Sequence, residues 1–571
     1  HIRKLASEIP GPKSYPLIGN ILDVLAWTKE ESYKKYLRMV INYSPTVRFW
    51  AGPYLIIFVS DPCDLEILMN SDKCLERERF KNISDTYPLG DGLLVIGGEQ
   101  WRIHRKFIIS SFHYRHFEYF VKVFNKKSNI LVNCLKQDPN TTTCINILHY
   151  FTRAAFDSIC ETIIGVEMNS QDKGSDKFID SMTTYLRIGT QMFSQPWLLN
   201  PTICSFNILP QENAAYMTSF CNELINNKMK EYRERTKDSS PTKEHTNNFN
   251  KRDQPLLIDS IIEMIENNEC FFSKKEIIGE INNIIMAGMD STANSLRFHQ
   301  DVQRKVQEEL DAVFGDDVER SVSMEDINNL KYTEQVIKES LRLYPAAPFV
   351  PRNTIEDIKI TNYTLPKGCD VIFNIYSLHR NPKIYPNPDE FDPENFSPER
   401  SPDEFDPENF SPERSKGRHP YSFLPFSGGF RKCVGYKFAM IQMKIVLATV
   451  LRHFTVHPAC DRKEMDRWDF NFTLKLVNGS KVKLISRNMM FHHKTQKLRD
   501  RGAEDTGKLC VYYNQREAGK RCERVIPTLH LHSVQCAVTH KNTCITDFPH
   551  PRLPLCCACP ASNVRRALCC Q

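Results

Sequence analysis

The spacing of apolar residues predicts a chain that is mainly helical. From about Glu31 to Leu310 apolar residues recur every three to four positions, which is the period of an amphipathic helix. The short apolar run LIIFVS (Leu55–Ser60) predicts a strand, and the polar stretch Tyr232–Pro255 predicts an exposed loop. After Asn329 another helix precedes short strands and proline-rich loops. The expected class is therefore mainly α with small β-sheets (α+β).

Changes in composition divide the chain into three parts. Residues 1–20 end in IPGPKSYPLIGN, whose prolines predict a stiff, extended hinge. Residues 21–488 carry the periodic pattern and form the predicted main domain. Residues 489–571 lose that pattern and cluster cysteines, so we expect a poorly ordered tail. Cys556 and Cys559 suggest a zinc knuckle, but the absence of a second ligand pair favours surface acylation or no function.

A tandem duplication spans residues 388–415. The segment PDEFDPENFSPERS occurs at Pro388–Ser401 and again, without change, at Pro402–Ser415. Solenoid repeats diverge and recur at least three times, because each unit needs neighbours to bury its apolar face. Two identical proline-rich copies indicate a duplicated loop or an error in assembling the sequence. We expect one copy to be looped out.

Charge and cysteine placement narrow the class of protein. The net charge is +6, from 75 basic and 69 acidic residues, and no basic stripe with interleaved aromatic residues indicates nucleic-acid binding. No run of about 20 apolar residues predicts a membrane span, and the chain starts at His1, so we expect a membrane anchor to be absent from this chain. Scattered cysteines before residue 510 indicate a reducing compartment.

The segment FSGGFRKCVG, residues 426–435, contains the strongest candidate chemistry. Gly429 can adopt positive φ, and Gly435 allows the backbone to approach a flat ligand. The apolar spacing of Tyr436–Phe454 predicts a helix, whose N-terminus favours the thiolate of Cys433. Arg431 presents a charged fork that suits a carboxylate. Together these features indicate a cysteine loop that holds haem iron.

This loop resembles the haem-binding signature of the cytochrome P-450 superfamily. The matching positions are Phe426, Gly429, Arg431, Cys433 and Gly435. The resemblance covers about residues 9–488 and implies the P-450 fold. In that fold haem lies between the I-helix and the cysteine loop with its L-helix, and Cys433 ligates the iron.

The resemblance extends to residues expected to bind the haem propionates. In WRIHR, Trp101 and Arg105 resemble the family's C-helix pair, and they lie four residues apart so that one helix face presents both. In PFVPR, Arg352 stands at the position of another propionate-binding arginine. Any one of these, considered alone, is more often a surface residue. Their order along the chain supports the resemblance.

KESLRLYP, residues 338–345, resembles the family's K-helix. It implies that Glu339 and Arg342 form a buried ion pair that braces the cysteine loop. Asn395 replaces the arginine of the family's FxPxRF pattern, so this brace is expected to lack its third partner.

EINNIIMAGMDSTANSL, residues 280–296, resembles the I-helix that crosses the distal face of the haem. Ala287 and Gly288 lack bulk and leave room for oxygen, and we expect a relaxed backbone turn near Gly288. Many members of the family 4 branch carry at Ala287 a glutamate that is esterified to haem. Alanine has no carboxylate, so the porphyrin is predicted to be non-covalent.

The same helix carries the expected proton-delivery residues. Asp290, Ser291 and Thr292 are catalytic candidates, because an acid next to an alcohol suits general-acid work. Serine stands where the family usually has threonine, and its freer rotamer predicts some leakage of reduced oxygen species. The following join, Asn294–Val306, is roughly seven residues shorter than the family pattern, about two helical turns.

The resemblance implies a haem-thiolate monooxygenase that inserts one oxygen atom of O2 into a small apolar substrate, a fatty-acid-like or xenobiotic chain. The stretch Gly90–His113 carries the likeness to the family 4 branch, whose members often hydroxylate lipids. The implied cofactors are haem b, O2, and electrons from NADPH through a flavoprotein reductase, with cytochrome b5 as a second partner. The implied location is the cytosolic face of the endoplasmic reticulum membrane. The expected reductase dock comprises Lys432, Lys437 and Lys444.

Two other interpretations stay open. The duplication, the short join and the unusual tail fit an inactive or haem-deficient product of a damaged or mis-spliced gene of the same family. A haem-thiolate rearrangement without external electrons is disfavoured by the acid and hydroxyl residues of the I-helix.

Overall fold

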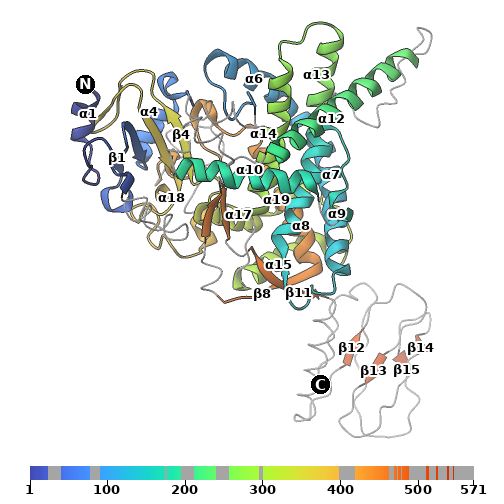
Figure 1. Cartoon of the computed structure of the whole chain (residues 1–571). Coiled ribbons are helices and arrows are strands. Elements are labelled where there is room, and N and C mark those ends of the chain that lie inside the picture. Colours follow the sequence, from blue (N-terminus) through green and yellow to red (C-terminus); the bar gives the residue numbers. More distant parts are fainter. Residues whose placement is uncertain are drawn as a thin grey trace. The chain divides into compact units, whose positions relative to one another are not determined.

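The chain divides into two units, His1–Ile485 and Ser486–Gln571, in a computed structural model (Figure 1). The structure describes residues 1–22, 40–77, 90–173, 176–194, 211–238, 256–294, 300–397, 418–461, 468–471, 473–476, 479–487, 510–512, 522–524, 537–538 and 544–545. The second copy of the duplicated segment and the Cys556/Cys559 pair lie outside these residues. In the second unit the structure describes only short antiparallel pairs, formed by β12 (Cys510–Tyr512), β13 (Cys522–Arg524), β14 (Ala537–Val538) and β15 (Cys544–Ile545).

A four-stranded sheet forms one side of the first unit (Figure 1). Its order is β1 (Thr46–Ala51), β2 (Tyr54–Val59), β7 (Asp370–Asn374) and β4 (Phe349–Asn353). β2 and β7 run parallel, and the other neighbours are antiparallel. The strand predicted from the LIIFVS run is confirmed as β2. The neighbouring short elements are α1 (Ile2–Glu8), α4 (Pro62–Met69), η1 (Asp72–Cys74), β5 (Ile358–Lys359), β6 (Thr364–Leu365) and α18 (Ile375–Leu378).

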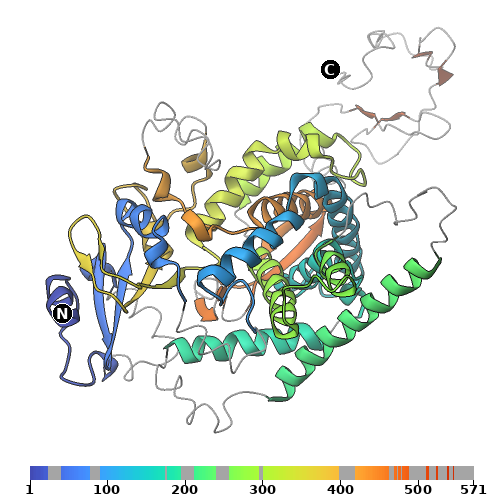
Figure 2. The same cartoon turned by 90° about the horizontal axis from the view of Figure 1, so that it is seen from above.

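Helices form the other side of the first unit, and the predicted mainly helical class is confirmed (Figure 2). The helices are α6 (Gly98–Ser111), α7 (Phe117–Gln137), α8 (Ile147–Ile159), α9 (Ser170–Lys173), α10 (Lys177–Ser194), α12 (Gln211–Asp238), α13 (Leu257–Glu266), α14 (Lys274–Asn294), α15 (Gln300–Phe314), α16 (Met324–Asn329), α17 (Lys331–Leu343) and α19 (Tyr436–His453). Short turns are η2 (Tyr114–His116), the π-helical η3 (Cys160–Ile164), η5 (Pro393–Phe396), η6 (Pro420–Ser422) and η7 (Gly429–Arg431). Small sheets add β3 (Ile145–Asn146), β8 (Phe454–Pro458), β11 (Lys481–Ser486), β9 (Trp468–Asn471) and β10 (Thr473–Leu476).

Aromatic packing fixes α19, the helix that follows Cys433. Phe438 is buried and makes edge-on contacts with Phe120 and Phe124 of α7, at ring distances of 5.4 and 4.9 Å. Such T-shaped pairs stabilise a core beyond the area that they bury. The start of α19 is therefore held in place from behind.

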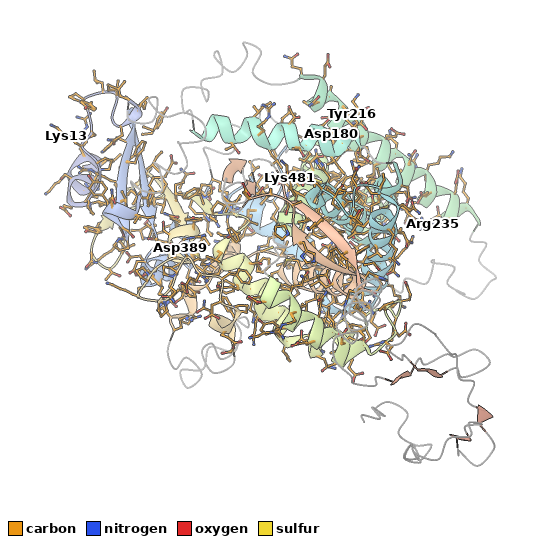
Figure 3. The ribbon with its side chains drawn as sticks, turned by 90° about the horizontal axis from the view of Figure 1, so that it is seen from below. Lys13, Asp180, Tyr216, Arg235, Asp389 and Lys481 are labelled. Atoms are coloured by element: carbon orange, nitrogen blue, oxygen red, sulfur yellow. The ribbon has the colours of Figure 1, made fainter. Side chains whose placement is uncertain are left out.

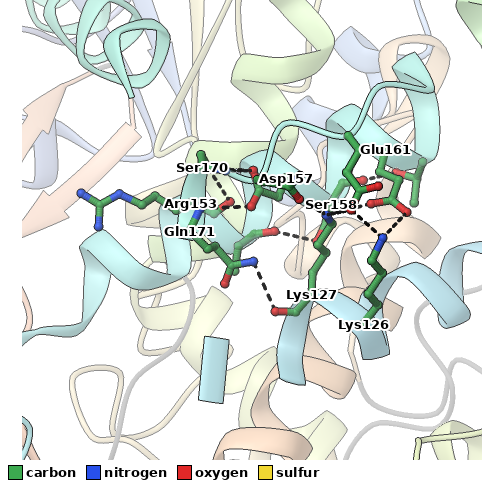
Figure 4. Close-up of polar contacts among 12 residues, drawn as sticks. Lys126, Lys127, Arg153, Asp157, Ser158, Glu161, Ser170 and Gln171 are labelled. Atoms are coloured by element: carbon green, nitrogen blue, oxygen red, sulfur yellow. Dashed lines mark hydrogen bonds and ion pairs between the residues drawn. The ribbon is translucent and has the colours of Figure 1, made fainter. Parts of the chain in front are cut away.

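Buried charges join α7 to η3 and α8 to α9 (Figure 4). Lys127 is 1% exposed, and its Nζ lies 2.8 Å from Oε2 of Glu161. The buried Asp157 accepts hydrogen bonds from the amide and hydroxyl of Ser170, at 2.9 and 2.7 Å. Because these charges have partners within the chain, burying them is compatible with a stable core.

The predicted loop at Tyr232–Pro255 is wrong at its start, because α12 continues to Asp238. Ion pairs hold these polar turns: Arg233 reaches Glu266 of α13 at 2.9 Å, and Arg235 reaches Glu231 at 3.1 Å. Pairs of opposite charge four residues apart support a helix that has little apolar surface. Figure 3 shows Arg235 toward the end of α12, and Asp180 of α10 beside Tyr216, where α10 and α12 pack.

Candidate active site

The cysteine loop runs from Leu424 to the start of α19. Gly429 has φ +60°, and a Cβ there would lie 2.1 Å from the carbonyl oxygen of Met69, so the position requires glycine. The amide of Cys433 donates to the carbonyl of Phe426 at 3.0 Å, which closes the loop on itself. Cys433 is thereby fixed three residues before the first residue of α19.

One cavity of about 350 Å³ brings together the loop, α6 and α14. The loop contributes Phe426, Arg431, Cys433 and Gly435, and α14 contributes a face that contains Ala287 and Gly288. Most of the remaining wall is apolar, including Leu93, Leu94, Val95, Ile108, Phe112, Ile159, Leu186, Ile284, Val350, Phe438 and Met443. The predicted loop and I-helix residues therefore share one apolar chamber.

The thiol of Cys433 faces this cavity. Burial among protein atoms raises its pKa, while the amide of Gly435 and the charges of Arg105 and Lys432 act in the opposite direction. Desolvation by the surrounding protein is the largest of these effects, and the amide of Gly435 and the two charges favour the thiolate against it. A further positive charge at the sulfur is needed to hold the thiolate.

Three arginines line the cavity, Arg77, Arg105 and Arg431, and the charge of Arg352, which is not one of the lining residues, acts on Arg77 and Arg431. Burial, together with mutual repulsion, lowers the pKa of Arg431 to about 9, and burial lowers that of Arg352 to about 10. The pKa of Arg77 falls well below its usual range, because burial and the charges of Arg352 and Arg431 all oppose ionisation. Arg105 also has a lowered pKa, caused by burial. A cluster of buried cations that repel one another is a site for an anion.

Two nitrogens of this cluster lack partners. Nε of Arg77 and Nε of Arg431 are buried and have no hydrogen-bond partner within the described residues. Nη2 of Arg431 donates to the carbonyl of Ile96 at 2.6 Å, and its guanidinium lies 4.5 Å from the ring centre of Trp101. Arg105 lies 5.5 Å from the same ring. Trp101 thus orients both arginines, and donors remain for a carboxylate.

The predicted brace lies behind the cysteine loop. Glu339 and Arg342 are both fully buried and pair through two bonds, Nε to Oε2 at 2.7 Å and Nη2 to Oε1 at 2.8 Å. The amide of Asp392 also donates to Glu339, at 2.8 Å. The amide of the Asn395 side chain reaches Glu339 at 3.4 Å, a long contact. The carboxylate therefore has partners other than the arginine expected at position 395.

Comparison with known proteins decides the family. A model of the cytochrome P450 family matches residues 9–401 and 400–481. This chain belongs to the cytochrome P450 family. The two matched segments meet inside the tandem duplication, where the extra copy interrupts the family pattern.

Relatives of this cytochrome P450 include members of family 4. It is 29% identical to cytochrome P450 4g15 of Drosophila melanogaster, over 85% of this chain and 93% of that protein. It is 29% identical to cytochrome P450 4c21 of Blattella germanica, over 83% and 92% of the two chains. It is also 29% identical to human cytochrome P450 4V2, over 83% and 89%. The predicted resemblance to the P-450 superfamily and to its family 4 branch is confirmed.

The cavity of this cytochrome P450 fits haem, the cofactor that the family implies. A porphyrin bears two carboxylates, and the unpartnered nitrogens of Arg77 and Arg431 are buried donors for such groups. The thiol of Cys433 faces the same cavity, and Ala287 presents no side chain that would bond to the porphyrin. The donor chemistry of this cavity is thus consistent with haem.

α14 runs as a continuous α-helix through Gly288, and the predicted relaxed turn is absent from this described stretch. A Cβ at Gly288 would lie 2.9 Å from the side chain of Ile159, so this glycine also allows α14 to pack closely against α8. The backbones of Asp290, Ser291 and Thr292 belong to α14, but their side chains lie outside what the structure describes. Residues 295–299 of the short join are likewise outside it.

Sequence reasoning missed Arg77 and a buried acid–imidazole pair. Nδ1 of His104 lies 2.8 Å from Oε1 of Glu280, which joins α6 to α14, and burial raises the pKa of Glu280. Both residues lie in segments quoted for other positions, WRIHR and EINNIIM. A polar residue at a helix position that faces the core was the available signal. Arg77 lies in LERERF, which resembles an ordinary exposed charged run, so it gave no signal.

The predicted reductase dock is corrected at one position. Lys444 is 6% exposed and binds Glu334 at 2.5 Å and the carbonyl of Ile327 at 2.9 Å. It is an internal cation of α19 and cannot meet a partner protein. Lys437 is exposed and Lys432 is half-buried. Among the described helices, we find none that is long and apolar enough to cross a bilayer.

Proposed function

We propose that this cytochrome P450 inserts one oxygen atom of O2 into an apolar chain, fatty-acid-like or xenobiotic, with electrons from NADPH. The observation that carries the proposal is the apolar cavity into which Cys433 faces, beside arginines with unpartnered donors. The family 4 relatives support a haem monooxygenase, and the apolar wall supports an apolar substrate.

The residues have distinct roles in this proposal. Cys433 holds the iron, and Phe426, Gly429 and Gly435 shape the loop that presents it. When bound, haem supplies the activation of O2. Trp101, Arg105, Arg352 and Arg431 would hold its carboxylates, together with Arg77.

The chain's other residues exclude water and handle protons. The apolar wall desolvates the substrate, and Ala287 and Gly288, which lack bulk, leave space along the α14 side of the cavity. Asp290 holds a proton and passes it through the hydroxyl of Ser291 or Thr292 into the cavity. An acid and two alcohols in succession on one helix support this assignment.

Partners and location are part of the same proposal. A flavoprotein reductase that uses NADPH docks near Lys432 and Lys437, where positive charge steers an acidic partner. Cytochrome b5 is a second electron donor. The protein works at the cytosolic face of the endoplasmic reticulum membrane, from which apolar substrates enter.

The porphyrin is held without a covalent bond, because Ala287 offers no carboxylate. Acid butanone should extract all of the haem from the wild-type protein. The matched variant Ala287→Glu should retain a fraction after turnover. Retention of haem by the wild type would contradict the assignment.

A carbon monoxide difference spectrum of the dithionite-reduced, purified protein tests the function. A strongly red-shifted Soret band, characteristic of thiolate ligation, is expected from the wild type and should be lost in Cys433→Ala. No haem band, or a band of thiol ligation, would instead support the second candidate, a haem-deficient product of a damaged gene. The duplication at residues 388–415 is the observation that favours this alternative.

A further inference from the structure

We propose that His379 is a positioning residue that couples the Glu339–Arg342 brace to the cysteine loop. Its ring lies between α17 and the loop, with Nδ1 3.2 Å from the carbonyl of Arg342 and Nε2 2.8 Å from the amide of Leu424. The inference rests on the proposed function, because the loop concerned is the one that presents Cys433.

The amide of Leu424 fixes the protonation of the ring. A backbone N–H can only donate, so Nε2 of His379 accepts. In the neutral imidazole Nδ1 then carries the proton and donates a hydrogen bond to the carbonyl oxygen of Arg342. Burial, with the charges of Arg342 and Arg380, holds the pKa of His379 at about 3, which keeps the ring neutral. One ring therefore bonds two backbone groups at once.

Within the described residues neither Glu339 nor Arg342 bonds directly to the loop, and the other link ends before it, at Arg418, which donates to the carbonyl of Asn395 at 3.0 Å. All five N–H donors of Arg342 are used: two bind Glu339, and three bind the carbonyls of His379, Pro388 and Glu390, at 2.9, 2.7 and 2.8 Å. These carbonyls precede the loop in sequence, and none belongs to it. The guanidinium of Arg342 therefore has no donor left to bind the loop at Leu424.

The ring of His379 is well placed to transmit position. It packs on Phe423 at a ring distance of 5.1 Å, and Phe423 lies 4.5 Å from Phe396. Leu424 lines the cavity, and two residues later the carbonyl of Phe426 accepts the amide of Cys433. The bond from His379 thus anchors the loop close to its cysteine.

Three variants separate the two hydrogen bonds. His379→Phe keeps the ring volume and loses both bonds. His379→Gln extends an amide oxygen toward Leu424 and keeps the acceptor, whereas His379→Asn is too short to reach it. His453→Phe, the same change at another buried histidine, is the matched control.

The readouts are amide hydrogen exchange across residues 418–435 and the fraction of thiolate-type carbon monoxide band after warming. In His379→Phe and His379→Asn we expect loop exchange to rise roughly tenfold, as a buried amide loses its partner, with exchange in α17 unchanged. In the same two variants the thiolate-type band should decay faster on warming than in the wild type. Loop exchange in His379→Gln and in His453→Phe should stay near that of the wild type.

The proposal would be overturned if loop amides exchanged at the wild-type rate in both His379→Phe and His379→Asn. It would also be overturned if the exchange rate rose equally in α17 and in the loop. If His379→Phe does not fold, the comparison of His379→Asn with His379→Gln decides. Faster loop exchange in His379→Asn supports the proposal, and equal loop exchange in the two variants overturns it. Failure of the proposed function is distinguishable, because it removes the thiolate-type band of the wild type and leaves the exchange comparison intact.

Discussion

The buried arginines of the brace and of the cavity differ in how their charge is matched. Arg342 is fully buried, and all five of its donors bind groups of the chain. Arg431 is buried and Arg77 is half-buried, yet each has a buried Nε without a partner in the described structure. Only the arginine of the brace has all of its donors bound without another molecule.

This difference distinguishes a structural cation from a binding cation. Burying a charge is costly unless it is paired, so an incomplete pair in a folded protein points to a ligand. Lys127, with Glu161, belongs with Arg342. Experiments that remove one cation or its partner should therefore give opposite results in the two regions.

The largest effect is expected from breaking the brace. Glu339→Ala leaves Arg342 buried without its counter-ion, which should lower the free energy of unfolding by about 3–5 kcal/mol. Urea unfolding monitored by circular dichroism measures the loss. A change below about 1 kcal/mol would show that the brace is not a buried pair that stabilises the fold.

A smaller effect of a different kind is expected from the cavity. Arg431→Gln and Arg77→Gln remove a repelled, incompletely paired cation, so the haem-depleted protein should be as stable as the wild type or more so. Haem should dissociate roughly 10- to 100-fold faster, because a hydrogen bond to a charged group is lost. Transfer of haem to an apo-globin acceptor measures that rate. A loss of stability like that of Glu339→Ala would erase the distinction.

Acid should weaken the link between brace and loop. In the unfolded chain His379 has a pKa of 6.5 and is protonated below that pH, whereas in the folded protein its pKa is about 3 and the ring stays neutral down to about that pH. Stability therefore falls as pH falls through this window, by about 1.4 kcal/mol per pH unit and by about 2 kcal/mol at pH 5. Urea unfolding at pH 7 and pH 5 should show a smaller decrease in His379→Gln. Equal decreases in variant and wild type would reject this role.

The smallest effect is expected at the surface. Lys437→Ala should raise the KM for the reductase roughly two- to fivefold at low salt, and high salt should remove the difference. Lys444→Met should leave that KM unchanged and reduce stability, because Glu334 loses a partner. Steady-state reduction of cytochrome P450 at two ionic strengths tests both. Equal KM effects would place Lys444 at the interface after all.

The sequence supported the fold class and the elements that carry the site, because motifs lie on strongly periodic segments. The helix expected at Tyr436–Phe454 is α19, and the K-helix residues lie on α17. What could not be predicted depends on pairing in three dimensions. From the sequence, Lys444 is expected to be exposed, and only the structure shows that it pairs with Glu334. Arg77 is likewise expected to be solvated, and only the structure shows that its Nε is buried without a partner among the described residues.

The tandem segment has a consequence for the brace. The carbonyls of Pro388 and Glu390 and the amide of Asp392, which close the Glu339–Arg342 pair, come from its first copy. Pro402, Glu404 and Asp406 repeat the same groups fourteen positions later. The Glu339–Arg342 pair binds backbone atoms of a segment that the chain contains twice. The same backbone groups are therefore available from either copy. Only connectivity, through the length of chain on either side, distinguishes one alignment from the other.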